Sequence, residues 1–290
     1  MLSRTLALAS LSLLGLGCPS GGDPADDVAV SLQFAARIGG EDAACGTSYA
    51  GVGTTSETLQ LQDLRFFVSA VHLVDTDGNE IPVTLDQETD WQHDDVALLD
   101  FEDGTGPCAE TGTPSMNSVV SGVVAAGEYN GLVFDLGVPF ELNHIDAATA
   151  PAPLNLIAMQ WNWQGGYKFA RVDTTNSNAA PNNRWFFHLG STGCESDAAT
   201  VAPASECAKP NRPRYSFDAF DAATDTVVFD LGDLLADTDV SANTPDTPPG
   251  CMSFPADVTD CAEVFPNLGL DWDTGACTNG CDQQTLFTVE

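Results

Sequence analysis

The fold is decided by residues 59–85, which read LQLQDLRFFVSAVHLVDTDGNEIPVTL. An apolar run at 66–74 is followed by the polar segment Asp75-Thr76-Asp77-Gly78-Asn79 and by a second β-rich run at 81–85. Asp-Gly between two such runs predicts a hairpin, because the turn needs positive φ and glycine adopts it without a side-chain clash. The oxygen donors in the turn lack the distal Glu of an EF-hand loop. We therefore expect a β-turn here and no calcium loop.

The rest of the chain repeats this pattern of short apolar runs separated by turn residues, with almost no helical periodicity. We expect strands at 28–38, 96–101, 119–125 and 132–138, a hairpin made of 215–220 and 226–231, and a single short helix at 232–240. Such a pattern is typical of all-β proteins. The fold class expected is a single disulfide-linked β-sandwich or Greek-key barrel with long irregular loops.

The N-terminal segment carries export signals. Residues 1–17 hold one basic residue and then an apolar run that is too short to cross a membrane, which predicts a signal peptide. Cys18 follows the small residue Gly17, so we expect lipidation at Cys18 and a flexible lipoprotein tether at 18–27. Residues 28–290 then form one β domain whose last part, 241–290, is a Cys-rich irregular tail. The expected location is the periplasm or the outer membrane, with the lipid anchor as the only contact with the membrane.

Eight cysteines remain after Cys18, and an even number in an exported chain predicts a framework of four disulfides. Sequence proximity favours three bridges with short loops, and the remaining two cysteines then form the fourth. The expected pairs are Cys194 with Cys207, Cys251 with Cys261, Cys277 with Cys281, and Cys45 with Cys108.

The formal net charge of the chain is -33. A surface this acidic repels phosphate backbones, so we expect no nucleic-acid partner. Solubility outside the cell explains the acidity, and attraction for cations or a basic partner is the alternative. The few basic residues gather in the second half of the chain, at Lys168, Arg171, Arg184, Lys209, Arg212 and Arg214.

Two tryptophans lie one residue apart in the segment 159–171, MQWNWQGGYKFAR. On a β-strand alternate residues share a face, so Met159, Trp161 and Trp163 are expected to point the same way. Strand aromatics usually fill a core, which favours a packing role for both indoles. A functional role remains open at this point.

Of the four histidines, His72 is expected on the polar side of a strand and His93 in a solvated acidic loop. His144 and His188 flank the tryptophan segment beside small or turn residues, and imidazole is a common ligand for late first-row metals. Two structural histidines explain the pattern equally well. Four other kinds of site are disfavoured. The sequence has no histidine downstream of a free cysteine for blue copper, no Cys-x-x-Cys-His for haem attachment and no Gly-x-Ser-x-Gly hydrolase elbow. Zinc binding by cysteines is disfavoured because thiols oxidise outside the cell.

An ordered set of short segments runs through the chain: 137–140 (GVPF), 143–144 (NH), 153–156 (PLNL), 159–169 (MQWNWQGGYKF), 188–194 (HLGSTGC) and 251–253 (CMS). Together they resemble the MbnP-like family, which comprises exported copper-binding proteins found beside methanobactin systems, also called the four-Cys member of the metallo-mystery pair. The resemblance extends from the first expected strand to Cys261.

The resemblance implies that a di-haem partner enzyme of the cytochrome c peroxidase and MauG group oxidises one tryptophan to kynurenine. Kynurenine and two histidines then bind a single copper ion. Carried over by motif position, the histidines are His144 and His188, and the oxidised residue is Trp161 or Trp163. The protein itself is then not an enzyme. The competing hypotheses are an acidic extracellular β-sandwich that binds calcium or carbohydrate, and an extracellular hydrolase for which no nucleophile stands out.

Overall fold

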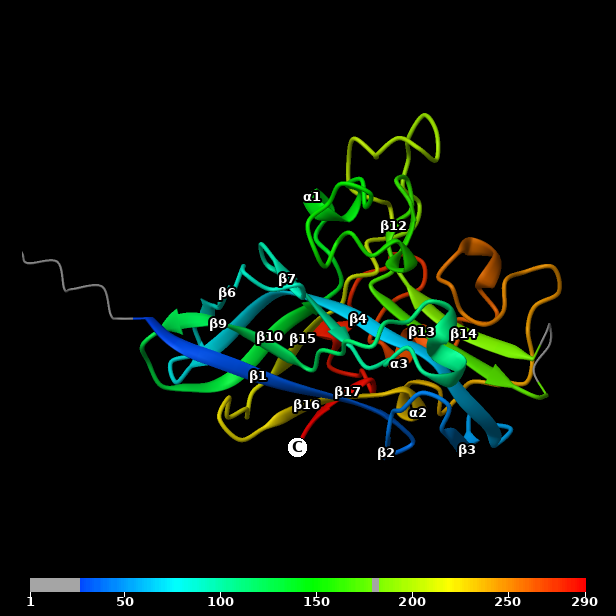
Figure 1. Cartoon of the computed structure of the whole chain (residues 1–290), viewed down its shortest axis with the longest axis horizontal. Helices are drawn as coiled ribbons and strands as arrows, with labels where there is room; N and C mark the ends of the chain where they lie inside the picture. Colours follow the sequence, from blue (N-terminus) through cyan, green and yellow to red (C-terminus); the bar gives the residue numbers. More distant parts are fainter. Residues whose placement is uncertain (1–26, 179–182) are drawn as a thin grey trace, which may run out of the picture.

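The computed structural model describes residues 27–178 and 183–290. The expected signal peptide, the lipidation site Cys18 and all of the tether except Asp27 lie outside these residues. The described chain forms two large β-sheets that face each other (Figure 1). Within this part of the chain, no helix is long and apolar enough to cross a membrane.

The smaller sheet has six strands in the order β17-β16-β1-β9-β6, with β2 paired to β1. β1 and β16 run parallel, and the other pairs are antiparallel. The strand bounds are β1 Asp27–Ile38, β2 Glu41–Asp42, β6 Thr84–Leu85, β9 Val119–Ala125, β16 Thr226–Asp230 and β17 Phe287–Val289.

The larger sheet has nine strands and is built around β4, and a separate two-stranded sheet contains the tryptophan segment. The strands of the larger sheet are β3 Ser48–Val52, β4 Glu57–Asp75, β5 Glu80–Pro82, β7 Gln92–His93, β8 Val96–Asp100, β10 Tyr129–Leu136, β13 Ala170–Asn176, β14 Arg184–Leu189 and β15 Arg214–Phe217. The small sheet consists of β11 Gln160–Asn162 and β12 Gly166–Tyr167.

β4 is the 19-residue strand that organises the larger sheet. Along one edge it pairs first with β13 and then with β10, while β3, β8 and β5 follow one another along the other edge. The expected hairpin is present, since Leu73 pairs with Ile81 across a turn in which Gly78 has φ of 85°. The Asp75 carboxylate accepts hydrogen bonds from the backbone of Asp77 and Asn79, so the turn itself uses the expected oxygen donors.

The core lies between the two sheets and is rich in phenylalanine. Phe66 of β4 stacks on Phe229 of β16 with ring centroids 5.0 Å apart, and Phe34 of β1 contacts Phe134 of β10 edge-on. Phe287 of the last strand packs against three of these rings. Aromatic contacts of this kind add to the hydrophobic gain from burial. The two sheets therefore form a sandwich, and no closed barrel is formed by the described strands.

Helical segments are short and lie in the connections between strands. They are η1 Gly106–Glu110, α1 Phe140–Asn143, η2 Ile157–Met159, α2 Leu231–Leu234, η3 Pro255–Asp257, α3 Val264–Asn267 and η4 Asn279–Cys281. The expected helix at 232–240 is thus reduced to the single turn α2, and it is not the only helix. The expected C-terminal part of this helix is missing, because the helix ends at Leu234 and Leu235 is its C-cap.

Two expectations for the C-terminal part of the chain are wrong. The runs near 215–220 and 226–231 do not form a hairpin, because β15 joins β10 in the larger sheet and β16 joins β1 in the smaller one. The tail after residue 241 is not wholly irregular. Its last residues form β17, and Phe265, Leu268 and Phe287 are buried in the core.

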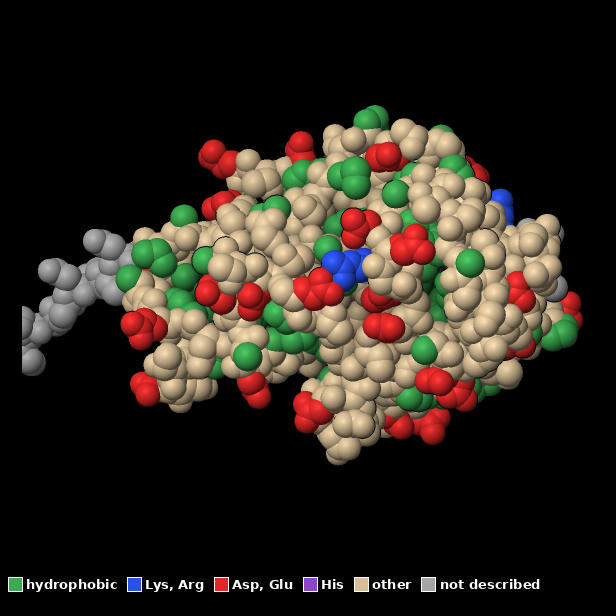
Figure 2. Space-filling view, turned by 90° about the horizontal axis from the view of Figure 1, so that it is seen from below, with side chains coloured by type: hydrophobic (Ala, Val, Ile, Leu, Met, Phe, Trp, Pro, Cys, Tyr) green, Lys and Arg blue, Asp and Glu red, His purple; other side chains and the backbone are tan. Residues whose placement is uncertain are grey.

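Four disulfides are present, and they join the pairs that sequence proximity favoured: Cys45–Cys108, Cys194–Cys207, Cys251–Cys261 and Cys277–Cys281. The first of these connects segments 63 residues apart and fixes η1 beside β4. Acidic side chains are spread over the face shown in Figure 2, where basic side chains appear at few places.

Candidate metal centre

The segment 138–168, here called the crown segment, leaves the larger sheet after Gly137 and returns to it at Phe169. Both of these residues bond to Phe67 of β4. Gly137 N–H donates to the Phe67 carbonyl and Phe67 N–H donates to the Phe169 carbonyl, both at 2.8 Å. Gly137 has φ of 132°, and a Cβ there would lie 2.7 Å from the Phe169 ring, which explains the glycine. The crown segment carries α1, η2 and the tryptophan hairpin, and it stands above the sheets (Figure 1).

The tryptophan hairpin is shorter than its sequence indicates. β11 ends at Asn162, whose side chain accepts a hydrogen bond from the Gly165 N–H and so starts the turn. Met159 is fully buried in η2, Trp161 is half-buried, and Trp163 lies in the turn with 38% of its surface exposed. The expectation that Met159, Trp161 and Trp163 share one strand face is therefore wrong, because the strand is too short to include all three.

Trp161 packs against Gly190, the residue after β14, and against Phe254. The centroids of the Trp161 and Phe254 rings are 4.9 Å apart. A Cβ on Gly190 would lie only 2.4 Å from Cζ3 of Trp161, so the indole occupies the place of a side chain at this position. In a strand, residues i and i+2 lie on the same face. If the strand direction continues past Leu189, the indole therefore occupies the side-chain position that comes after His188 on that face. The parallel stacking of the Phe186 and His188 rings, at 5.7 Å, agrees with that arrangement.

His188 is buried and has one ring nitrogen fixed and one without a partner. Nε2 lies 2.5 Å from Oδ1 of Asp173 on the neighbouring strand β13. Nδ1 is buried and has no hydrogen-bond partner among the described residues. A histidine that binds a metal commonly donates its other ring N–H to a carboxylate, which sets the tautomer and the ring orientation. His188 has this arrangement, with Nδ1 available to a ligand.

Burial keeps the imidazole of His188 neutral. Burial lowers the pKa of His188 below its usual value, although the hydrogen bond to Asp173 opposes that change. Burial alone would raise the pKa of Asp173, but His188 and Arg171 outweigh it and lower the pKa of this carboxyl below its usual range. A neutral imidazole beside an ionised carboxylate is the form in which histidine binds metals.

A cavity of about 280 Å³ opens beside His188. Its walls come from η1, η2, β13 and β14 and include the side chains of Lys168, Arg171, Asp173, Arg184, Glu110 and Ile157. Burial and the charge of Arg171 lower the pKa of Lys168 to about 8. The residues that line this cavity come from segments far apart in the sequence, which is why no local motif indicates it.

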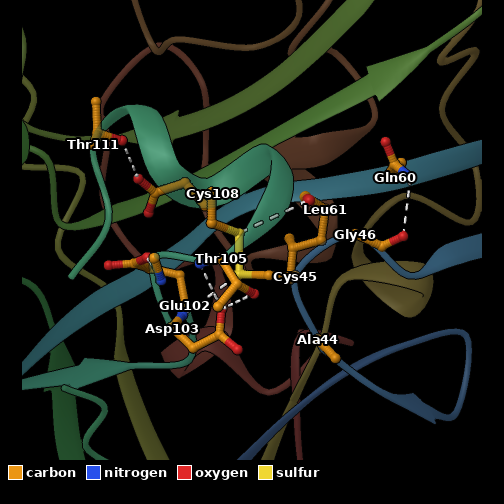
Figure 3. The surroundings of a disulfide bond; sticks show 12 residues. Ala44, Cys45, Gly46, Gln60, Leu61, Glu102, Asp103, Thr105, Cys108 and Thr111 are labelled. Atoms are coloured by element: carbon orange, nitrogen blue, oxygen red, sulfur yellow. Dashed lines mark hydrogen bonds between the residues drawn. A yellow bond between two sulfur atoms is a disulfide. The ribbon is translucent and has the colours of Figure 1, made fainter. Parts of the chain in front are cut away.

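A chain of buried ion pairs connects Asp173 to the loop held by Cys45–Cys108. Arg171 contacts both Asp173 and Asp63, and Arg65 contacts both Asp63 and Glu102. The Thr111 hydroxyl donates to Asp63. Figure 3 shows Glu102 beside the disulfide, and Thr111 farther from it at the C-terminal end of η1. Buried charges need such partners, because removing one leaves another uncompensated.

His144 lies next to Asn143 and Cys207, which line a different cavity, of about 390 Å³. It follows α1, and Nδ1 is 2.9 Å from the Trp163 carbonyl oxygen, so Nδ1–H is the donor. Nε2 is 3.2 Å from Nδ2 of Asn143 and 3.6 Å from Sγ of Cys207. Burial lowers the pKa of His144, and the hydrogen bond to Trp163 opposes that change. His144 is therefore also a neutral imidazole with an oriented ring.

Asn143 connects the elements around His144. Its Nδ2 donates to the Ser191 hydroxyl at 2.9 Å, and its Oδ1 accepts from the Tyr167 N–H at 2.8 Å. A Cβ on Gly166 would lie 2.5 Å from this Oδ1, so the side chain of Asn143 needs a glycine opposite. The Asn143 side chain thus connects α1 to β12 and to Ser191, which lies just after the end of β14.

The structure places the four predicted site residues as two pairs. Trp161 packs against Gly190, two residues after His188, and the Trp163 carbonyl accepts a hydrogen bond from Nδ1–H of His144. The cavities beside the two histidines share no lining residue. His72 has Nδ1 2.7 Å from the Ala70 carbonyl, and His93 is half-buried near Asp94.

Two groups of potential metal ligands occur among the described residues. His144 lies with Cys194 and Cys207, and Glu102 lies with Cys45 and Cys108. All four sulfurs are in disulfides, so neither group offers a thiolate to a metal. Asp173, Gly190 and Asn143 were missed as site residues by sequence reasoning. The sequence does contain a pattern that could have indicated Asp173. In Arg171-x-Asp173 and Asp63-x-Arg65, two residues of opposite charge lie two positions apart within buried strands.

These features define a class of protein: a disulfide-linked β-sandwich that carries a carboxylate-oriented histidine of the metal-binding type beside a tryptophan hairpin. The sequence model of the MbnP family matches residues 27–253, and the chain belongs to this family. Among solved structures, MbnP from Methylosinus trichosporium is 34% identical, with a TM-score of 0.82 over 91% of this chain and 98% of that one. None of the curated proteins matches the chain.

Proposed function

We propose that this chain is an exported copper-binding protein whose site forms when a tryptophan is oxidised to kynurenine by a di-haem partner enzyme of the MauG and peroxidase group. One copper ion is bound by kynurenine and by His188 and His144. The protein acts by binding and not as an enzyme. Family membership supports the association with copper. The observation that carries the proposal is the buried Nδ1 of His188, which has no partner among the described residues while Asp173 holds Nε2.

The chemistry explains why an oxidised tryptophan is needed. The indole nitrogen has no lone pair available for a metal, whereas the amine of kynurenine has one. Oxidation inserts two oxygen atoms across the C2–C3 bond, and two molecules of hydrogen peroxide reduced to water balance the step. Hydrolysis then releases the formyl carbon as formate. Nitrogen ligands of this kind suit copper.

Trp161 is the residue we assign to oxidation. Its ring lies over Gly190, two residues after His188, which supports Trp161 as the source of an amine ligand on the His188 side of the hairpin. Trp163 contributes a backbone carbonyl to His144, a role that does not depend on its indole. The same hairpin therefore connects the surroundings of both histidines, which supports a site that uses both.

The export of the chain belongs to the same proposal. A signal peptide at 1–17 and lipidation at Cys18 place the protein in the periplasm or at the outer membrane, anchored by its lipid. The four disulfides agree with an oxidising compartment.

The test is co-expression with the di-haem enzyme, followed by peptide mass spectrometry and copper titration. We expect kynurenine at position 161, one copper per chain, and a large loss of affinity in His188→Ala and His144→Ala. His72→Ala is the matched control, since its ring bonds only the Ala70 carbonyl among the described residues. Unmodified tryptophans after verified co-expression, or full copper affinity in the His144, His188 double variant, overturn the proposal. Stabilisation by calcium and not by copper would favour the acidic binding-module alternative.

A further inference from the structure

Lys168 is a buried cation that forms no ion pair with any described carboxylate. Only 9% of the residue is exposed, and it lines the cavity beside His188. Its ammonium group donates one hydrogen bond, of 2.9 Å, to the Ala158 carbonyl. An ammonium group has three donors, so two remain for a partner. A buried charge without a counter-charge is costly, and such a group is usually paired.

Three cationic and two acidic side chains line the cavity: Lys168, Arg171 and Arg184, with Glu110 and Asp173. The guanidinium of Arg171 is already engaged with Asp173 and with Asp63 behind the cavity wall. Arg184 lies at the exposed side over the Phe186 ring and forms no ion pair with a described carboxylate. The two cations without a carboxylate partner therefore line one cavity of about 280 Å³.

We propose that this cavity binds one small monocarboxylate, of the size of formate or acetate, at the ammonium of Lys168. The ammonium supplies a point charge and two further donors, and Arg184 adds positive charge at the exposed side of the same cavity. A dianion would leave negative charge uncompensated beside Asp173 and Glu110. The site needs neither copper nor kynurenine, so it stands or fails independently of the proposed function.

The experiment uses the full mature chain without copper and without the di-haem enzyme. Acetate, chloride and inorganic phosphate are titrated at constant ionic strength, and binding is followed by calorimetry and by amide NMR shifts of β13 and β14. We expect saturable binding of acetate only. Equal saturable effects of chloride and acetate, or no saturable effect of acetate, overturn the proposal.

Lys168→Met keeps the length of the side chain and removes the charge, and we expect acetate affinity to fall by at least about tenfold. Lys209 is the only other lysine in the chain and lies over the Trp272 ring, so Lys209→Met is the matched control and should bind acetate like the parent. Arg184→Gln, at an exposed position, gives a second test if Lys168→Met fails to fold. Undiminished acetate binding in a folded Lys168→Met variant overturns the assignment.

Discussion

Asp173 and His188 are joined across β13 and β14 by a hydrogen bond of 2.5 Å, and Nδ1 of the imidazole has no partner in the part of the chain that the structure describes. Arg171 in turn contacts the other oxygen of the same carboxylate, so Asp173 is held from two sides. The orientation of the histidine is therefore set by the sheet and not by a flexible loop.

Asp173→Asn tests this orientation. The amide has no charge to hold Nε2–H, so the imidazole can adopt the other tautomer, and we expect copper affinity of the modified protein to fall by roughly 10–100-fold. Competition with a chelator measures the change. Asp230→Asn is the control, since Asp230 is another buried carboxylate but lies in β16 of the smaller sheet, where it accepts hydrogen bonds from the backbone of Gly39 and Gly40. Equal losses in both variants would show a general effect of buried charge.

Gly190→Ala tests the placement of Trp161. The new methyl group would lie 2.4 Å from the indole, so the ring must move, and overpacking of this kind costs about 1–3 kcal/mol. We expect altered tryptophan fluorescence and less kynurenine after co-expression. Gly165→Ala is the control, because its nearest contacts lie at 3.4 Å. Unchanged kynurenine yield in Gly190→Ala would argue against Trp161 as the oxidised residue.

The raised pKa of Asp100 leads us to expect that the stability of the protein depends on pH. Burial raises its pKa from the ordinary 3.8 to about 7, and Arg65 only partly offsets this. The folded state then binds the proton more tightly than the unfolded state, so this group adds stability as the pH falls from about 7 to about 4, by at most about 4 kcal/mol. Asp100→Asn should be more stable than the parent at pH 8 and should lose this trend. Urea denaturation at both ends of the range measures it, with exposed Asp77→Asn as the control.

The disulfide Cys45–Cys108 supports one wall of the cavity beside His188. It closes a loop of 63 residues, and replacing both cysteines with alanine should cost about 4 kcal/mol by the chain-entropy estimate. The Cys277–Cys281 bridge spans only 4 residues and should cost about 2 kcal/mol, which makes it the control. Only the first double variant should show faster hydrogen exchange in η1, where Pro107 and Thr111 line the cavity. Equal exchange rates of η1 in the two double variants would show that the Cys45–Cys108 disulfide does not support the cavity wall.

Local patterns in the sequence predicted most of the strands, because turn chemistry and alternation are short-range. The hairpin at Gly78 and the strand at 119–125 are examples. The partners of β15 and β16 could not be read in this way. Both have the same apolar pattern, and the choice of sheet depends on contacts with β10 and β1, which lie far away in the chain.

The candidate site was predictable only in part. The histidines and tryptophans stood out as residue types, and the family resemblance pointed to His144 and His188 with either Trp161 or Trp163. The free nitrogen of His188 depends on Asp173, which is one strand away, and the place of Trp161 depends on the missing side chain of Gly190. Such cross-strand relationships follow from register, which no spacing in the sequence encodes.

The parallel pair of β1 and β16 has a consequence for the order of folding. Gln33 pairs with Thr226, so the first strand of the domain obtains this neighbour only after most of the chain has been synthesised. Until then that edge of β1 has free backbone donors and acceptors, which is the condition that favours pairing with other chains. A topology with such long-range pairing folds slowly, so the nascent protein depends on protection from aggregation until its last strands arrive.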